Sequence, residues 1–214
     1  MKTKLGILCV ILGVLLMAGA LHLYLRNEQE QNQAAESASV IMPQIVEAIH
    51  QRAEEQAAKN VPADPADRPQ IQIVPMTESE KKEMPVVEID GYGYIGFVGI
   101  PTLEQELPVM ADWSYPQLKL SPCRFTGSTV EDDLVVMAHN YSYHFGSLKD
   151  LRVGDTVTFT DMDGQTIYYE VMALDVLGPY DVEEMTSGEF DLTLFTCNYS
   201  GKARVTVRCD RVEE

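Results

Sequence analysis

The 214-residue chain has a formal net charge of −17, and 45% of its residues are hydrophobic. The hydrophobic fraction suits a globular core, and the length allows one ordinary domain with additional segments. Because so acidic a surface repels phosphates, the composition argues against a nucleic-acid-binding protein and against a soluble protein that lies on anionic lipid. We interpret the charge as a contribution to solubility.

The N-terminal segment predicts a membrane anchor. Residues 5–25 are apolar and contain no Asp, Glu, Lys or Arg, and a helix of that length spans about 31 Å, enough to cross a hydrocarbon core. Lys2 and Lys4 precede this run, whereas Arg26 is soon followed by acidic residues, so the positive-inside rule places the N-terminus in the cytoplasm. A signal peptide cleaved near 18–20 is the alternative. Both readings place the rest of the chain outside the cell.

The next segment, 27–85, is predicted to be an extracellular stalk. Apolar residues recur near helical spacing between 36 and 58, which predicts an amphipathic helix. Five prolines follow between 62 and 85 with few large apolar residues, a composition that favours a semi-extended spacer over a packed core. A featureless linker is the alternative, and it predicts the same behaviour.

From residue 86 onward, short runs rich in β-branched and aromatic residues alternate with turns. Such runs predict strands, here at 93–100, 134–139, 155–160, 165–174, 190–197 and 203–211. The segments 161–164 and 198–201 have the composition of hairpin turns. A short helix is expected at 145–152, where apolar residues recur every third position.

So many closely spaced strands imply a barrel or a sandwich. The fold class predicted is all-β with minor helix. The domain organisation predicted is an anchor with its cytoplasmic tip at 1–26, a stalk at 27–85 and a β-domain at 86–214.

The cysteines and histidines do not form a metal-binding pattern. Four cysteines and four histidines lack a C-x-x-C pair and the spacing of zinc ligands. Three cysteines lie outside the predicted membrane segment, an odd number, so at least one thiol there is free; a disulfide between Cys123 and Cys209 is left open. The acidic runs 131–133 and 161–163 leave calcium binding open, although both look like turns.

Three residues carry candidate catalytic chemistry: His139 and Cys197 each end a predicted strand, and Arg204 follows Cys197 across a tight turn. A thiolate is the reactive form of cysteine, and a neighbouring cation stabilises it. A histidine can protonate a leaving amine and later accept a proton from the incoming nucleophile. Arginine stays charged and offers several donors to an oxyanion. Together these roles describe a cysteine acyl transferase.

Each candidate has a rival. His144 competes with His139 as the base, and a buried core residue is the alternative reading of Cys197. Arg208 and Arg211 compete with Arg204; Arg208 shares a strand face with Arg204 but lies further from the turn, so it ranks second.

Longer motifs around these residues resemble one enzyme family. The segment LTLFTCNYSGKARVTV resembles the sortase signature T-L-x-T-C, which is followed after a short loop by an arginine on the next strand. The segment VVMAHNYSYHFGSLKDLRVGDTV looks like the sortase stretch with a strand-end histidine, F-x-x-L and L-x-x-G-D. The segment GYIGFVGIP looks like the first strands of the sortase barrel. These motifs occur in the expected order and cover most of 86–214.

The resemblance implies a closed sortase-type β-barrel and a role for each matching residue. Cys197 corresponds to the nucleophile, His139 to the acid–base partner and Arg204 to the oxyanion-binding or substrate-positioning group. Thr196 matches the residue before the nucleophile and is implied to contact substrate. The implied chemistry needs neither a cofactor nor a metal ion.

The implied activity is transpeptidation at the surface of a Gram-positive bacterium. Such an enzyme cleaves a sorting signal in an exported protein, holds the acyl group as a thioester, and transfers it to an amine of a cell-wall precursor or a pilin. Ala138 stands where the family usually has glycine, and the pair His139–Asn140 leans toward class B-like sortases.

Two other functions are left open by the residues themselves. One is a non-catalytic surface β-domain that binds partners at the membrane, and the other is a different cell-wall cysteine hydrolase. Papain-like hydrolases place the cysteine before the histidine, the reverse of the order here, and the Ser-His-Gly-Cys run of L,D-transpeptidases is absent.

Overall fold

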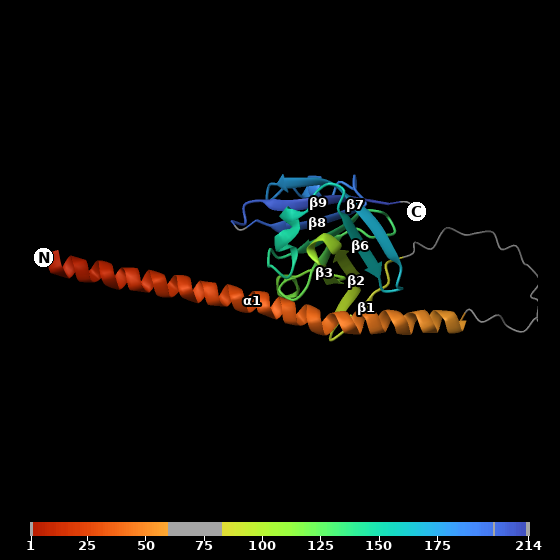
Figure 1. The fold of residues 1–214 in the computed structure, drawn as a ribbon, viewed down its shortest axis with the longest axis horizontal. Helices are drawn as coiled ribbons and strands as arrows, with labels where there is room; N and C mark the ends of the chain where they lie inside the picture. The colour runs from red at the N-terminus through yellow and green to blue at the C-terminus, as the bar shows by residue number, and fades with distance from the viewer. Residues whose placement is uncertain (1, 60–82, 199, 213–214) are drawn as a thin grey trace, which may run out of the picture.

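The computed structural model describes residues 2–59, 83–198 and 200–212, and it shows a long helix lying against a closed β-barrel (Figure 1). The helices are α1 (Lys2–Lys59), α2 (Tyr115–Leu118), α3 (Val182–Met185) and the 3-10 helices η1 (Pro101–Leu103) and η2 (Phe145–Asp150). The strands are β1 (Val87–Ile89), β2 (Tyr92–Ile100), β3 (Gln105–Met110), β4 (Cys123–Thr126), β5 (Leu134–Ala138), β6 (Thr156–Asp161), β7 (Thr166–Leu177), β8 (Leu192–Cys197) and β9 (Arg204–Arg211).

The described strands form one sheet in the order β1-β2-β3-β4-β5-β8-β9-β7-β6. Strand β2 also pairs with β6, which closes β2 to β9 into a barrel, while β1 adds to the edge as a short antiparallel partner of β2. Two pairs are parallel, β3 with β4 and β5 with β8. The predicted closed all-β barrel with minor helix is therefore confirmed.

Side-chain alternation along β5 and β8 decides which residues fill the barrel. Leu134, Val136 and Ala138 of β5 belong to the main core cluster, together with Leu192 and Leu194 of β8. The residues between them therefore point out of the barrel. His139 and Cys197, one position beyond Ala138 and Thr196, fall in this outward-facing set.

The predicted strands correspond to β2, β5, β6, β7, β8 and β9, whereas β1, β3 and β4 were not expected. The helix predicted at 145–152 is the 3-10 helix η2. The turn at 161–164 joins β6 to β7 as expected. There the carboxylate of Asp161 accepts backbone hydrogen bonds from Asp163 and Gln165, both at 2.9 Å, and Gly164 has a φ of 78°.

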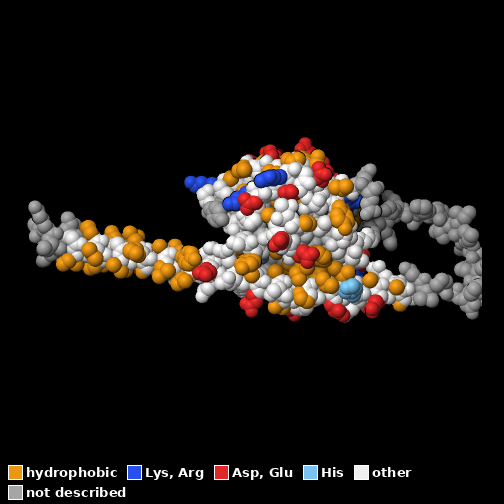
Figure 2. Space-filling model, in the orientation of Figure 1, with side chains coloured by type: hydrophobic (Ala, Val, Ile, Leu, Met, Phe, Trp, Pro, Cys, Tyr) orange, Lys and Arg blue, Asp and Glu red, His pale blue; other side chains and the backbone are white. Residues whose placement is uncertain are grey.

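Helix α1 joins the apolar N-terminal run to the barrel without a break. The amphipathic helix expected at 36–58 is present, but it is the C-terminal part of this longer helix, which continues through Pro43. By length and composition α1 is the one described helix that could cross a membrane, and its most apolar window has a mean hydropathy of 1.9. Figure 2 shows the hydrophobic side chains that cover its N-terminal part, where it extends beyond the barrel.

The C-terminal part of α1 packs on the barrel. Ile45 is fully buried and Ile41 nearly so, in a cluster that includes Met110 of β3 and Met162 of the β6–β7 turn. Arg52 forms an ion pair with Asp163 in the same turn. The first part of the expected stalk is thus a docked helix, and most of the proline-rich remainder, 60–82, lies outside the described residues.

Candidate active site

Strand pairing brings the three candidate catalytic residues to one place. In the parallel pair β5–β8, Ala138 lies opposite Thr196, so His139 and Cys197 leave the same edge of the sheet side by side. In the antiparallel pair β8–β9, Cys197 lies directly opposite Arg204. Two adjacent strand pairings therefore place a histidine and an arginine on either side of the cysteine.

The three side chains line one pocket of about 220 Å³ on the outer wall of the barrel. All three residues are partly exposed. They lie on the outer wall because the inward positions of these strands are taken by core residues. Cys197 also borders a second hollow of about 80 Å³, which Asn140 and Gly146 help to line. Cys197 therefore lines two separate hollows.

Apolar side chains form the rest of the larger pocket. Phe195, two positions before Cys197 on the same strand face, meets Phe125 of β4 edge to face at 5.5 Å, and Trp113 lies against Phe125 at 6.0 Å. Val182 and Met185 of α3 also line this pocket. The pocket thus has an apolar, aromatic floor with polar groups at one end, an arrangement common in sites that bind organic ligands.

Sequence reasoning missed this apolar wall. Phe195 and Met137 could have been found, because each lies two positions before a candidate catalytic residue and must share its strand face. Trp113, Phe125 and Met185 carry no such local signal, because they come from segments that were not assigned to any element.

His139 is held by the loop that follows it. Its carbonyl accepts a hydrogen bond from the backbone N–H of Phe145 at 3.1 Å, and its ring stacks on Tyr141 with centroids 4.7 Å apart. Burial lowers the pKa of His139, while the negative charge of Glu30 opposes that change by raising it. The imidazole is therefore mainly neutral at neutral pH and able to accept a proton.

Arg204 is tied only loosely to its surroundings. Its guanidinium donates to the carbonyl oxygens of Gly201 and Ala203, at 3.3 and 3.4 Å, within the β8–β9 turn. Neither contact is to a charged partner. A guanidinium held this weakly can turn toward an anion in the adjoining pocket.

Thr196 is placed differently from the other predicted site residues. It is 4% exposed, and its hydroxyl donates to the carbonyl of Ala138 at 2.9 Å. This bond ties β8 to β5 just before Cys197 and His139. Thr196 therefore holds the ends of β5 and β8 in register, and its contact with substrate stays a prediction.

The rival residues have other surroundings. His144 is fully buried, and burial lowers its pKa to about 4. Arg208 is buried among carbonyl groups of α3, and Arg211 pairs with Asp132 at 2.6 Å. None of these side chains lines the pocket that contains Cys197.

The two other cysteines of the barrel, Cys123 and Cys209, are buried and unpaired in the structure. Burial raises the pKa of the Cys123 thiol to about 12, and it raises the pKa of the Cys209 thiol as well. Both thiols are therefore protonated and shielded from solvent, whereas Cys197 is partly exposed. Among the described residues, no group of three or more His, Cys, Asp or Glu side chains is arranged to hold a metal ion.

Fold and pocket together define a closed all-β barrel in which a cysteine, a histidine and an arginine border one outer pocket. The Sortase domain family model matches residues 98–212, which is more than half of the chain. The chain therefore belongs to the sortase family. That membership supports a cysteine transpeptidase, and the recognition from the sequence motifs is confirmed.

Solved structures give the same fold. Sortase C1 from Streptococcus agalactiae is 27% identical over 59% of this chain and 72% of its own, with a TM-score of 0.52. Streptococcus pneumoniae sortase C is 23% identical, over 84% and 97% of the two chains, with a TM-score of 0.55. Sortase A from Corynebacterium diphtheriae is 20% identical, over 92% and 96%, with a TM-score of 0.52. A comparison with curated proteins found no match, and the class B-like subclass stays a prediction.

Proposed function

We propose that this protein is a membrane-anchored transpeptidase that uses Cys197 as its nucleophile, His139 as its acid–base group and Arg204 as its oxyanion-binding or substrate-positioning group. The observation that carries the proposal is the single pocket bordered by all three residues. Its substrates are exported proteins with a C-terminal sorting signal, and its acceptors are amines of a cell-wall precursor or a pilin.

In the first step the neutral imidazole of His139 takes the proton of the Cys197 thiol. The sulfur then attacks the carbonyl carbon of the scissile peptide bond, and Arg204 donates hydrogen bonds to the resulting oxyanion. When the C–N bond breaks, His139 gives its proton to the departing amine. The acyl fragment remains attached to sulfur as a thioester.

In the second step an incoming amine attacks the thioester carbonyl. His139 takes the proton that the amine loses, the C–S bond breaks, and the sulfur regains a proton to become the Cys197 thiol. The two hollows that border Cys197 support this sequence, because the acyl group bound to the sulfur and the amine that attacks its carbonyl carbon both need space beside Cys197.

The apolar N-terminal run of α1 supports an anchor, with the N-terminus in the cytoplasm and the barrel outside a Gram-positive cell. Lysines before the run and acidic residues after it favour that orientation. Protease treatment of intact cells tests it, since only an outward-facing barrel would be digested.

The site is tested by trapping the acyl-enzyme. The full chain, in detergent, is incubated with a library of sorting-signal peptides, and mass spectrometry is used to find the acyl group on Cys197. Replacing Cys197 or His139 with alanine should abolish the adduct, whereas Cys123→Ala, a matched loss of a buried thiol, should preserve it. A protein that works only as a binding module would retain its function without Cys197.

Iodoacetamide provides an independent test that needs no substrate. Under native conditions it should alkylate Cys197 and spare Cys123 and Cys209, because both are buried and have raised thiol pKa values. Labelling of either buried cysteine with Cys197 left inert would refute the site.

A further inference from the structure

Helix α1 reaches the immediate neighbourhood of the candidate catalytic histidine through Glu30. One oxygen of the Glu30 carboxylate accepts a hydrogen bond from the Tyr141 hydroxyl at 3.0 Å. The other oxygen accepts from the Lys119 ammonium at 2.9 Å, and Arg26 lies 3.5 Å from the same oxygen. The Lys119 hydrogen bond lowers the pKa of Glu30, so the carboxylate is charged at neutral pH.

Tyr141 links Glu30 to His139, because its hydroxyl donates to Glu30 and its ring stacks on the His139 imidazole. Its ring is almost fully buried and stacks on the imidazole at 4.7 Å, with 28° between the ring planes. Burial raises the pKa of Tyr141 to about 12, so its hydroxyl stays protonated and can donate to Glu30. A shift of Glu30 would therefore move a ring that lies against the acid–base group.

The neighbouring residue of α1 holds the same loop. The side-chain oxygen of Gln31 accepts hydrogen bonds from the backbone N–H and the hydroxyl of Ser142, at 3.3 and 3.0 Å. Two successive helix residues thus bind the two residues that follow Asn140. This segment is the loop that leads out of β5 directly after His139.

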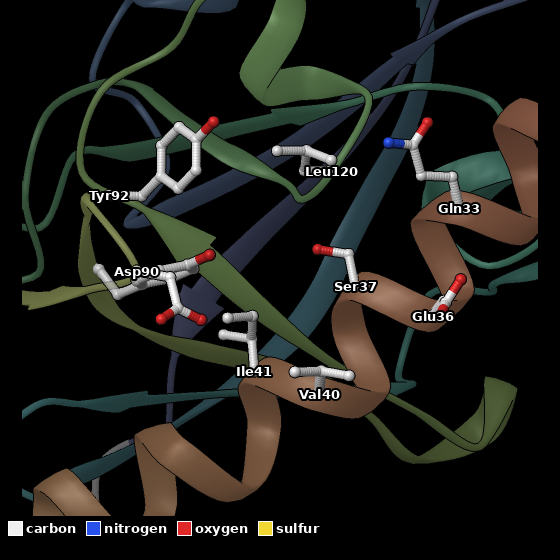
Figure 3. A pocket seen from close by; sticks show the side chains of 9 residues that line it. Gln33, Glu36, Ser37, Val40, Ile41, Asp90, Tyr92 and Leu120 are labelled. Carbon is white, nitrogen blue, oxygen red and sulfur yellow. The ribbon is translucent and has the colours of Figure 1, made fainter.

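The contact near Glu30 is separate from the place where α1 docks on the barrel core. A cleft of about 340 Å³ lies between the helix and the barrel, and Ser37, Ile41 and Tyr92 are among the residues that line it (Figure 3). Beyond the cleft, Ile45 and Arg52 anchor the helix at the β6–β7 end. Docking of α1 therefore does not by itself require Glu30.

We propose that Glu30 is a positioning residue for the active site: it orients Tyr141, and through Tyr141 it holds His139 against the pocket. This inference rests on the proposed role of His139. This role of Glu30 would give helix α1 a function in positioning the active site in addition to its proposed function as an anchor. Glu30 does not touch the reacting atoms.

The charges around His139 fix the sign of the expected pH effect. Glu30 on α1 raises the pKa of His139, while burial and Lys119 lower it. The neutral His144 lies behind Tyr141, and Cys197 and Arg204 border the same pocket. Removing the Glu30 charge leaves the opposing influences in place, so the pKa of His139 falls further.

The test compares Glu30→Gln with Glu47→Gln in the full chain in detergent. Glu47 is a matched control, because it lies on the same helix and its carboxylate accepts a hydrogen bond from Gln51 within that helix. With the peptide identified by acyl-enzyme trapping, Glu30→Gln should lower kcat about tenfold with little change in KM, the size of one charge-assisted hydrogen bond. The acidic limb of the kcat/KM profile should move to lower pH.

Tyr141→Phe separates the hydroxyl from the ring. It should reproduce much of the loss in kcat, and the double variant with Glu30→Gln should be little worse than the single variants, because both act through one contact. Iodoacetamide should also alkylate Cys197 more slowly at pH 7 in Glu30→Gln, since the imidazolium that favours the thiolate is less stable.

The outcomes distinguish this inference from the proposed function. If Cys197→Ala and His139→Ala are inactive while Glu30→Gln matches Glu47→Gln in rate and pH profile, the positioning role is wrong and the enzyme assignment stands. If Glu30→Gln loses rate with an unmoved pH profile and a lowered melting temperature, Glu30 serves stability alone and the inference is overturned. Full activity of Cys197→Ala would overturn the proposed function itself.

Discussion

The arginines of β9 are expected to have separate roles, and Arg208→Met tests the structural one. Arg208 is only 3% exposed. Its guanidinium donates to the carbonyls of Met185 and Glu184, at 3.0 and 2.8 Å, and to the Thr193 hydroxyl at 3.1 Å. The ion pair with the partly exposed Asp175, at 3.5 Å, adds little. Arg208 therefore ties α3 to the barrel.

The cost of Arg208→Met follows from the acceptors that lose their donor. A hydrogen bond from a charged donor contributes about 1.5–3 kcal/mol, and the bonds are not additive. Methionine keeps most of the packing but leaves both α3 carbonyls unpaired, so we expect the free energy of unfolding to fall by about 3 kcal/mol. For a chain of this size that corresponds to a melting temperature lower by about 6–12 °C.

Arg204→Met is the matched control, since it makes the same substitution on the same strand face. Arg204 is partly exposed and bonds only to two turn carbonyls, so its loss should change the free energy of unfolding by no more than about 0.5 kcal/mol. Thermal melts of the full chain in detergent measure the stabilities, and acyl transfer at 25 °C measures the function. Arg204→Met should lose acyl transfer, whereas Arg208→Met should retain it with a raised KM, because α3 walls the pocket. Equal melting temperatures for the two variants would refute this division.

Three further outcomes are expected. Burial lowers the pKa of His144 to about 4, so below pH 6.5 the unfolded chain takes up a proton that the folded chain does not, and the free energy of unfolding falls by about 3 kcal/mol between pH 6.5 and pH 4. In thermal melts across this pH range His144→Phe should show a flatter dependence of stability on pH, and an unchanged slope would contradict this. Ile45→Ala should lower the free energy of unfolding by about 2–4 kcal/mol in denaturant titrations, whereas Val46→Ala, at a position that is 41% exposed, should change that free energy little. Equal effects of the two variants would show that α1 is not docked. Seven helical residues inserted after Leu25 would move the barrel about 10 Å further from the membrane. This insertion should slow processing of membrane-bound substrates in cells but leave turnover of a soluble peptide unchanged. Equal loss of the two activities would contradict the predicted geometry.

The strands that carry the candidate catalytic residues could be predicted because their local patterns are strong. The runs that became β5, β8 and β9 are rich in β-branched residues and end close to the predicted boundaries. Their pairing could not be predicted in the same way. The parallel contact of β5 with β8 joins segments separated by η2, β6, β7 and α3, and only the resemblance to a known family indicated it.

The strands that were missed have weak local signals for identifiable reasons. Strand β3 contains Pro108, which lacks the N–H that a central strand would donate and therefore argues against a strand. Strand β4 has only four residues, among them Arg124. Because β4 carries Phe125, missing it also hid the aromatic floor of the pocket.

The inward and outward faces of β8 could not be assigned from sequence, since both are apolar. Leu194 faces the barrel core, while Phe195 joins a separate cluster on the outer wall. Alternation fixed Phe195 and Cys197 to the same face, but it did not say which face was the interior. The closure of the barrel through β2 and β6 settles that choice, and it depends on contacts distant in sequence.

The continuity of α1 links the proposed membrane anchor directly to the barrel. If residues 5–25 cross the membrane, as proposed, Glu30 follows Leu25 by about 7.5 Å of helix. The end of the barrel that Glu30 contacts bears His139, whereas Arg52 meets the opposite end at Asp163. Figure 1 shows α1 extending beyond the barrel toward its N-terminus. With the proposed anchor, the helix would hold the pocket close to the membrane with its His139 end toward the lipid, and that geometry would favour substrates cleaved a short distance outside their own membrane segment.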